Sequence, residues 1–288
     1  MSYRIILAPL FGSDADAVVL GAAFAVSRRS EAHVVAMFVR PDPFDLVPLV
    51  GEGVSPAVIQ QLTDASESEI NHQRDAARTS FDSLAGAEGA AIVAAPPAPG
   101  RPSAHWVEIT GRRDEIVPRR ARASDLVVFS RIEAESPTTL RPTLEATLLG
   151  AGRPVMLAPP TPPSGIGHVV AIAWNGGVEA ARAVAAALPL IDAASAVHVL
   201  TAETSRTPFD VSLDLAEYLE WRGVSCARRP VAVADEPVGA ALLRTAGEVG
   251  ADLLVMGGYG RSRLRELLLG GVTRHVLAHA GLPVLMAH

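Results

Sequence analysis

Residues 168–202, HVVAIAWNGGVEAARAVAAALPLIDAASAVHVLTA, decide the fold, because they contain an apolar run, a short turn, a helical segment and a second apolar run. Residues 4–39, RIILAPLFGSDADAVVLGAAFAVSRRSEAHVVAMFV, follow the same order. Such self-similarity indicates a repeated structural unit, so the chain is predicted to consist of two similar halves. Two later pairs of segments also match: SDLVVFS at 124–130 with ADLLVMG at 251–257, and GRPVMLAP at 152–159 with GLPVLMAH at 281–288.

The domain organisation follows from the spacing of these repeats. Matching segments are 164 residues apart at the beginning of the halves and 127 to 129 apart near their ends, so the first half is about 36 residues longer. We predict a first domain over 1–160, with an insertion near 41–85, and a second domain over 161–288. The connector APPTPPSG at 158–165 is rich in proline, which is typical of a stiff linker.

The fold class is predicted to be α/β. Short apolar runs alternate with helical segments in each half, and the runs are continuous rather than alternating. Continuous runs indicate strands buried on both faces, and therefore a parallel sheet covered by helices. Each half is expected to hold five such strands. In the second half we expect them at about 168–174, 196–201, 225–231, 252–256 and 283–287.

Composition excludes several classes of function. The net charge of -6 and the pI near 5.8 give no overall positive field that would attract phosphate backbones, so no nucleic-acid partner is expected. The absence of lysine excludes a GxxxxGK[ST] phosphate loop and a Schiff-base lysine. Cys226 is the only cysteine, which excludes an intrachain disulfide and fits a reducing compartment. No apolar run reaches the roughly 18 residues of a membrane span and no signal peptide is recognisable, so a cytoplasmic location without membrane association is expected.

The expected ligand site lies where the strand order of the sheet reverses. In open parallel sheets, ligands bind beyond the carboxyl ends of the strands at that point. With five strands wound about the first, the reversal falls between the first and fourth strands of a half. In the second half the residues at these ends are Ala173, Trp174 and Asn175 after the first strand, and Met256, Gly257 and Gly260 after the fourth.

The stretch 256–273, MGGYGRSRLRELLLGGVT, resembles the nucleotide-binding signature of the universal stress protein family, as does the repeated strand order. The resemblance implies two tandem sandwiches of the adenine nucleotide alpha-hydrolase-like type. It also implies that the two sandwiches pack as an internal pseudo-dimer through their last strands, near 153–158 and 282–287. Association of two whole chains into a homodimer is left open. The residues that carry the signature are Gly257, Gly260 and Gly270, followed by Gly271, Val272 and Thr273.

The ligand that the resemblance implies is ATP or another adenine nucleotide, with or without Mg. Gly257 and Gly260 would let backbone N–H groups face the phosphates, and 271–273 would supply the free N–H groups of a helix start. These groups carry partial positive charge, so a phosphate can bind there without lysine. Adenosine would lie against the ends of the first two strands.

The sequence departs from the family pattern in both halves. Asn175 stands where the family's nucleotide binders have Asp, and Gly271 stands where they have Ser or Thr. In the first half, Phe11 replaces the Asp and 130–133, Ser-Arg-Ile-Glu, replaces the glycine turn. We therefore predict that only the second half binds nucleotide.

The predicted function is that of a regulatory module of the stress response, with an unidentified protein partner. The alternative is a nucleotide-free interaction protein, in which the glycine turn is a structural relic, Trp174 is a packing residue and the insertion makes the contacts. An enzyme that slowly hydrolyses ATP is a third candidate. No catalytic residues are predicted. His275 and His279 share a helix face without a third ligand, so no metal site is predicted.

Overall fold

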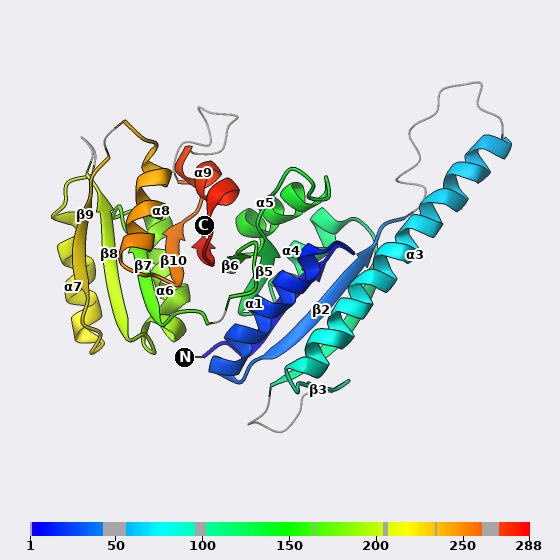
Figure 1. Cartoon of the computed structure of the whole chain (residues 1–288), viewed down its shortest axis with the longest axis horizontal. Helices are drawn as coiled ribbons and strands as arrows, with labels where there is room; N and C mark the ends of the chain where they lie inside the picture. The colour runs from blue at the N-terminus through cyan, green and yellow to red at the C-terminus, as the bar shows by residue number, and fades with distance from the viewer. Residues whose placement is uncertain are drawn as a thin grey trace.

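The computed structural model describes residues 2–42, 56–95, 102–163, 165–203, 207–233, 235–260 and 271–288 (Figure 1). In the first half the helices and strands follow the predicted order, with a long helix in the insertion. They are β1 (Ile5–Leu10), α1 (Ala15–Ser30), β2 (His33–Arg40), α3 (Pro56–Ala87), β3 (Ala91–Ile92), β4 (Ser103–Thr110), α4 (Arg113–Ala121), β5 (Leu126–Ser130), α5 (Leu140–Gly150) and β6 (Val155–Ala158).

The second half has the five predicted strands, each within two residues of its expected bounds. Its elements are β7 (Val169–Ala173), α6 (Val178–Ile191), β8 (Ala196–Ala202), α7 (Val211–Trp221), β9 (Ala227–Val231), α8 (Val238–Glu248), β10 (Leu253–Gly257), α9 (Gly271–His279) and β11 (Val284–Ala287). The first half differs from the prediction by the additional two-residue strand β3, which pairs with β4 at the edge of the sheet.

The strands form one sheet in the order β3-β4-β2-β1-β5-β6-β11-β10-β7-β8-β9. Within each half, neighbouring strands are parallel, as predicted. β1 lies between β2 and β5, and β7 lies between β8 and β10. The strand order therefore reverses between the first and fourth strands of each half, where the sequence placed the candidate site.

The two halves join through their last strands. β6 and β11 are antiparallel, and Val284, Leu285 and Met286 lie opposite Leu157, Met156 and Val155. The strands of the two halves consequently run in opposite directions across this seam. The structure confirms that the two halves form an internal pseudo-dimer through their last strands. Their strands form a single continuous sheet rather than two separate ones.

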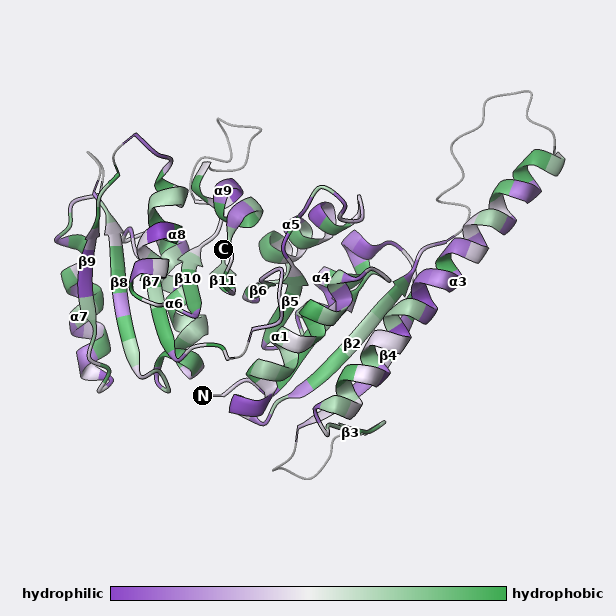
Figure 2. Ribbon diagram, viewed as in Figure 1, coloured by the Kyte–Doolittle hydropathy of each residue, from purple (hydrophilic) through white to green (hydrophobic). Residues whose placement is uncertain are grey.

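Two apolar clusters cover the two faces of the sheet, and each extends through both halves. Side chains of α1, α3, α6 and α7 pack on one face, and those of α4, α5, α8 and α9 pack on the other. Figure 2 shows the inner strands as mainly hydrophobic, whereas the edge strand β9 is hydrophilic. Its exposed Arg229 and Pro230 discourage pairing with another strand. Among the described residues, the helices are too short or too polar to cross a membrane.

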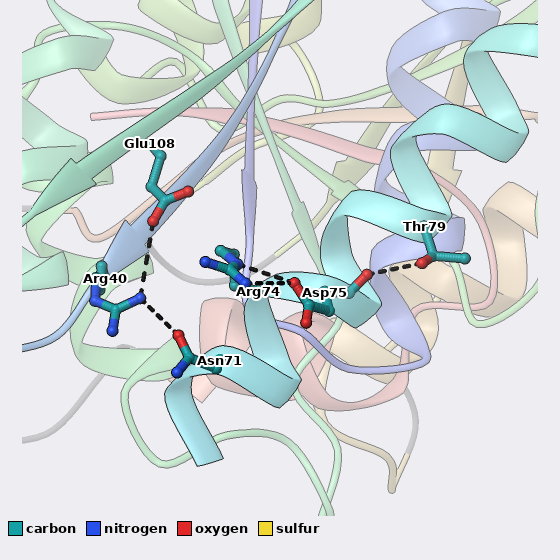
Figure 3. A network of polar contacts seen from close by, with 6 residues as sticks. All are labelled: Arg40, Asn71, Arg74, Asp75, Thr79 and Glu108. Carbon is teal, nitrogen blue, oxygen red and sulfur yellow. Dashed lines mark hydrogen bonds and ion pairs between the residues drawn. The ribbon is translucent and has the colours of Figure 1, made fainter. Parts of the chain in front are cut away.

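The helix α3 occupies the place that α7 has in the second half, but it has 32 residues where α7 has 11. Its amino-terminal turns project beyond the sheet, and its middle lies against the ends of β2 and β4 (Figure 1). Arg40, at the end of β2, donates a hydrogen bond to Asn71 Oδ1 at 2.9 Å and lies 4.0 Å from Glu108 on β4 (Figure 3). At Gly12, with φ at +75°, an added Cβ would lie 2.4 Å from the carbonyl oxygen of Gln73. The insertion is therefore packed directly against the turn after β1.

A pair of histidines joins β2 and β4 and should make stability depend on pH. His33 Nε2 lies 2.5 Å from His105 Nδ1. Burial, and next the neighbouring His105, lowers the pKa of His33, while burial, and next Arg120, lowers the pKa of His105. Because the folded chain favours the neutral rings, their contribution to stability is present above about pH 6.5 and is lost as the pH falls below it. We expect the free energy of unfolding, measured in urea, to decrease from pH 7.5 to 5.5.

The control for this prediction is the double variant His33→Asn/His105→Asn, which removes both titrating rings. It should lose less stability over the same pH interval than the unchanged chain. An equal decrease in both proteins would assign the pH dependence to other groups.

Candidate functional site

The three predicted segments of the second half meet around one cavity. Its volume is about 590 Å³, and it lies at the carboxyl ends of β7 and β10, beside the start of α9. Gly270 lies outside the described residues, and the other nine predicted residues line this cavity. They are Ala173, Trp174, Asn175, Met256, Gly257, Gly260, Gly271, Val272 and Thr273.

The glycines around the cavity have different structural roles. A Cβ at Gly257 would lie 2.7 Å from the backbone nitrogen of Ala180, so this glycine permits α6 to pack closely on the end of β10. Among the described residues, the nearest atom to such a Cβ at Gly260 is a carboxylate oxygen of Glu179 at 3.9 Å, and none lies within 4 Å at Gly271. Gly257 is therefore needed for packing, whereas Gly260 and Gly271 keep space open.

The turn after β7 is held by its own polar groups. Trp174 donates its indole N–H to the carbonyl oxygen of Val211 at 2.9 Å and packs against the core. Asn175 Oδ1 accepts a hydrogen bond from the backbone N–H of Gly177 at 2.9 Å. The packing interpretation of Trp174 thus has a physical basis, but its side chain also lines the cavity without filling it.

The start of α9 is tied to the glycine turn. Tyr259, whose φ is +55°, directs its backbone N–H toward Thr273 Oγ1 at 3.4 Å. The Thr273 side chain is buried, so its hydroxyl holds this turn in place. As α9 begins at Gly271, its first N–H groups lack partners within the helix and carry partial positive charge.

Sequence reasoning missed several residues that line the cavity. Leu200 and Ala202, on β8, could have been named, because the family resemblance placed adenosine against the ends of the first two strands. Glu179, in the first turn of α6, gave no comparable signal, because an acidic residue is common at a helix start. Its carboxylate is the charged group among the described lining residues. The other missed lining residues are Ala180, Thr207, Val238 and Leu242.

The corresponding position in the first half is occupied by side chains. The Phe11 ring is buried, and the Arg113 guanidinium lies over it, 5.0 Å from its centroid. In place of the glycine turn, Arg131 donates a hydrogen bond to the carbonyl oxygen of Ala280 at 3.2 Å and pairs with Glu133 at 2.6 Å. These contacts agree with the prediction that only the second half binds nucleotide, which stays a prediction.

His275 and His279 stack on α9 with ring centroids 4.2 Å apart. Among the described residues, no group of three or more His, Cys, Asp or Glu side chains is arranged to hold a metal ion. The two histidines therefore have no third ligand in the part of the chain that the structure describes.

Comparisons with known proteins agree with this architecture. Residues 168–288 match the model of the universal stress protein family. A universal stress protein from Archaeoglobus fulgidus DSM 4304 superposes with a TM-score of 0.68 at 15% identity, covering 98% of this chain and 97% of that one. For a universal stress protein of Pseudomonas aeruginosa UCBPP-PA14 the TM-score is 0.55 at 16% identity, with 98% and 92% covered. A search of curated proteins finds no match.

Sequence identities this low establish a shared fold but do not identify a ligand for this chain. The family match comes from the half that carries the glycine turn, whereas the structural likeness extends over both halves. Residues 168–288 therefore match the universal stress protein family by sequence, and the whole chain is similar in fold to tandem proteins of that family.

Proposed function

We propose that the second half binds ATP or a related adenine nucleotide, and that occupancy regulates the protein during stress. The observation that supports this proposal best is the cavity of about 590 Å³ at the point of strand reversal. Its volume falls in the range of small-molecule sites. Three segments far apart in sequence contribute backbone and apolar groups to it, as a nucleotide requires.

The proposed roles follow from the chemistry of the lining. Phosphates would occupy the open space beside Gly260 and Gly271, close to the start of α9. The base and ribose would lie against Ala173 and Leu200, at the ends of β7 and β8. The negative charge of Glu179 would repel the phosphates, so magnesium bound to the nucleotide would reduce the repulsion at this carboxylate.

The competing proposal is an interaction module that uses α3. Val58, Ile59 and Leu62 on its projecting turns are 44%, 37% and 40% exposed. Exposed apolar side chains at helical spacing are typical of surfaces that bind other proteins. This function would require no nucleotide.

Gly260→Glu is expected to abolish nucleotide binding while the fold persists. The new side chain would enter open space beside Glu179 and add a second carboxylate where phosphate would lie. We expect the affinity for Mg-ATP to fall at least about 100-fold, from the repulsion of like charges in a partly buried site. The measurements are calorimetry and the thermal shift at millimolar Mg-ATP. Ligand at 100 times its dissociation constant stabilises a protein by about 2.7 kcal/mol.

Gly247→Glu is the matched control, because Gly247 is exposed on α8 and has nothing within 4 Å of an added Cβ. It introduces the same charge into the same half and should leave binding unchanged. If the unchanged chain shows no thermal shift with Mg-ATP, and no adenine nucleotide is released when the purified protein is denatured, the nucleotide proposal is wrong.

A further inference from the structure

A second and larger cavity lies in the first half, away from the proposed nucleotide site. Its volume is about 970 Å³, and α3, the start of α4 and the start of α5 form its walls. The corresponding helix of the second half, α7, has 11 residues, so the wall that the 32-residue α3 forms is specific to the first half. The apolar part of its lining consists of Pro41, Leu62, Ala65, Ile70, Pro137 and Pro142.

Arg113 is a buried cation in the wall of this cavity. Its side chain is held between the rings of Phe11 and Phe38, at 5.0 and 5.6 Å from their centroids. It donates hydrogen bonds to the carbonyl oxygen of Val39 at 3.2 Å, to Thr139 Oγ1 at 3.1 Å and to Gln73 Oε1 at 3.4 Å. All three acceptors are uncharged.

No carboxylate in the described part of the chain forms an ion pair with Arg113, although buried charges in proteins are normally paired. Asp16 is the carboxylate that influences it, but Asp16 accepts hydrogen bonds from the backbone N–H groups of Phe11 and Gly12. Burial lowers the pKa of Arg113 to about 10, despite the opposing effect of Asp16. A buried charged group with a perturbed pKa at the wall of a cavity is a candidate for a binding site.

The other charged groups of the cavity are already engaged. Arg112 forms an ion pair with Asp114 at 3.0 Å, and Glu69 accepts a hydrogen bond from the amide of Gln73 at 2.9 Å. A dianion would meet the carboxylates of Glu69 and Asp114, whereas a monoanion balances the single charge of Arg113. The first N–H groups of α4 and α5 have no side-chain cap and add partial positive charge at this end.

We propose that this cavity binds a small monocarboxylate with an apolar body. The carboxylate contacts Arg113 and displaces its long hydrogen bond to Gln73 Oε1, while the apolar body lies against Leu62, Ala65 and Ile70. Both requirements are met by medium-chain fatty acids and by aryl carboxylic acids. This site is independent of the nucleotide site, so either proposal can fail without the other.

Octanoate is a suitable probe, with 1-octanol as the neutral molecule of the same length and inorganic phosphate as the small polar anion. We expect calorimetry on the full chain to detect octanoate binding at least about 10-fold tighter than binding of either comparison molecule, because a charge-assisted hydrogen bond is roughly twice as strong as a neutral one. Equal affinity for 1-octanol would overturn the anion-binding role of Arg113. Tighter binding of phosphate, or no binding of octanoate, would overturn the proposed ligand class.

The variant Ala65→Trp tests the location, because Ala65 is exposed on α3 and a Trp there fills the cavity. It should abolish octanoate binding, whereas Ala57→Trp, on the same helix but outside the cavity lining, should not. Arg113→Lys keeps the charge and should retain binding, whereas Arg113→Gln should weaken it at least about 10-fold. Circular dichroism verifies that each variant is folded. Unaltered binding in folded Ala65→Trp would overturn the assignment, and so would unaltered binding in Arg113→Gln.

Discussion

Replacing Leu285 by Asp is expected to cost about 5 kcal/mol or more in the free energy of unfolding, which is comparable to the whole stability of an ordinary domain. Leu285 is fully buried in β11 and lies opposite Met156 of β6 at the seam between the halves. The substitution removes a core side chain and buries a carboxylate among apolar groups. Urea unfolding followed by circular dichroism measures the effect.

Leu213→Asp is the matched control for the seam, because the same change occurs at a residue of α7 that is 49% exposed. The cost there should be below about 1 kcal/mol, as for most surface substitutions. Similar costs at both positions would contradict the packing assigned to β6 and β11.

Gly12→Ala is expected to destabilise the chain by about 3 kcal/mol, by two separable effects. The φ of +75° strains any residue with a Cβ, which costs about 1 kcal/mol. In addition, the methyl group would lie 2.4 Å from the backbone oxygen of Gln73, so α3 must move away from the turn after β1. Overpacking of this kind costs about 1–3 kcal/mol.

Gly89→Ala separates the two effects, because Gly89 has φ at +59° and nothing within 4 Å of an added Cβ. It should show the cost of strain alone, about 1 kcal/mol. Urea unfolding of the two variants compares them directly. If Gly12→Ala cost no more than Gly89→Ala, α3 would not be seated on this turn as the structure has it.

Most of the fold was predictable from sequence because its signals are local. Continuous apolar runs predicted the strands, and the repeat predicted two halves with the same strand order. The family resemblance implied the pairing of β6 with β11, and both strands are apolar. The candidate nucleotide site was predictable for the same reason, since strand ends at a reversal of order must lie close together.

What escaped prediction depends on contacts between segments far apart in the chain. The insertion near 41–85 was predicted, but its packing against Gly12 arises from a backbone contact with Gln73 that leaves no pattern in the sequence. Arg113 was not predicted as a site residue, because only its packing between Phe11 and Phe38 distinguishes it from the other arginines of α4. Gly257 was predicted to contact the ligand, whereas the structure shows that it also allows α6 to pack closely on the end of β10.

The seam between β6 and β11 belongs to a single polypeptide, in which 10 residues connect Ala158 to Val169. Two separate subunits meeting through the same strands would dissociate on dilution, whereas a tether of this length keeps the effective local concentration high at any expression level. The two halves of one chain cannot exchange partners as separate subunits would. The sequences of the two halves can therefore diverge independently, because each half always packs against the same other half.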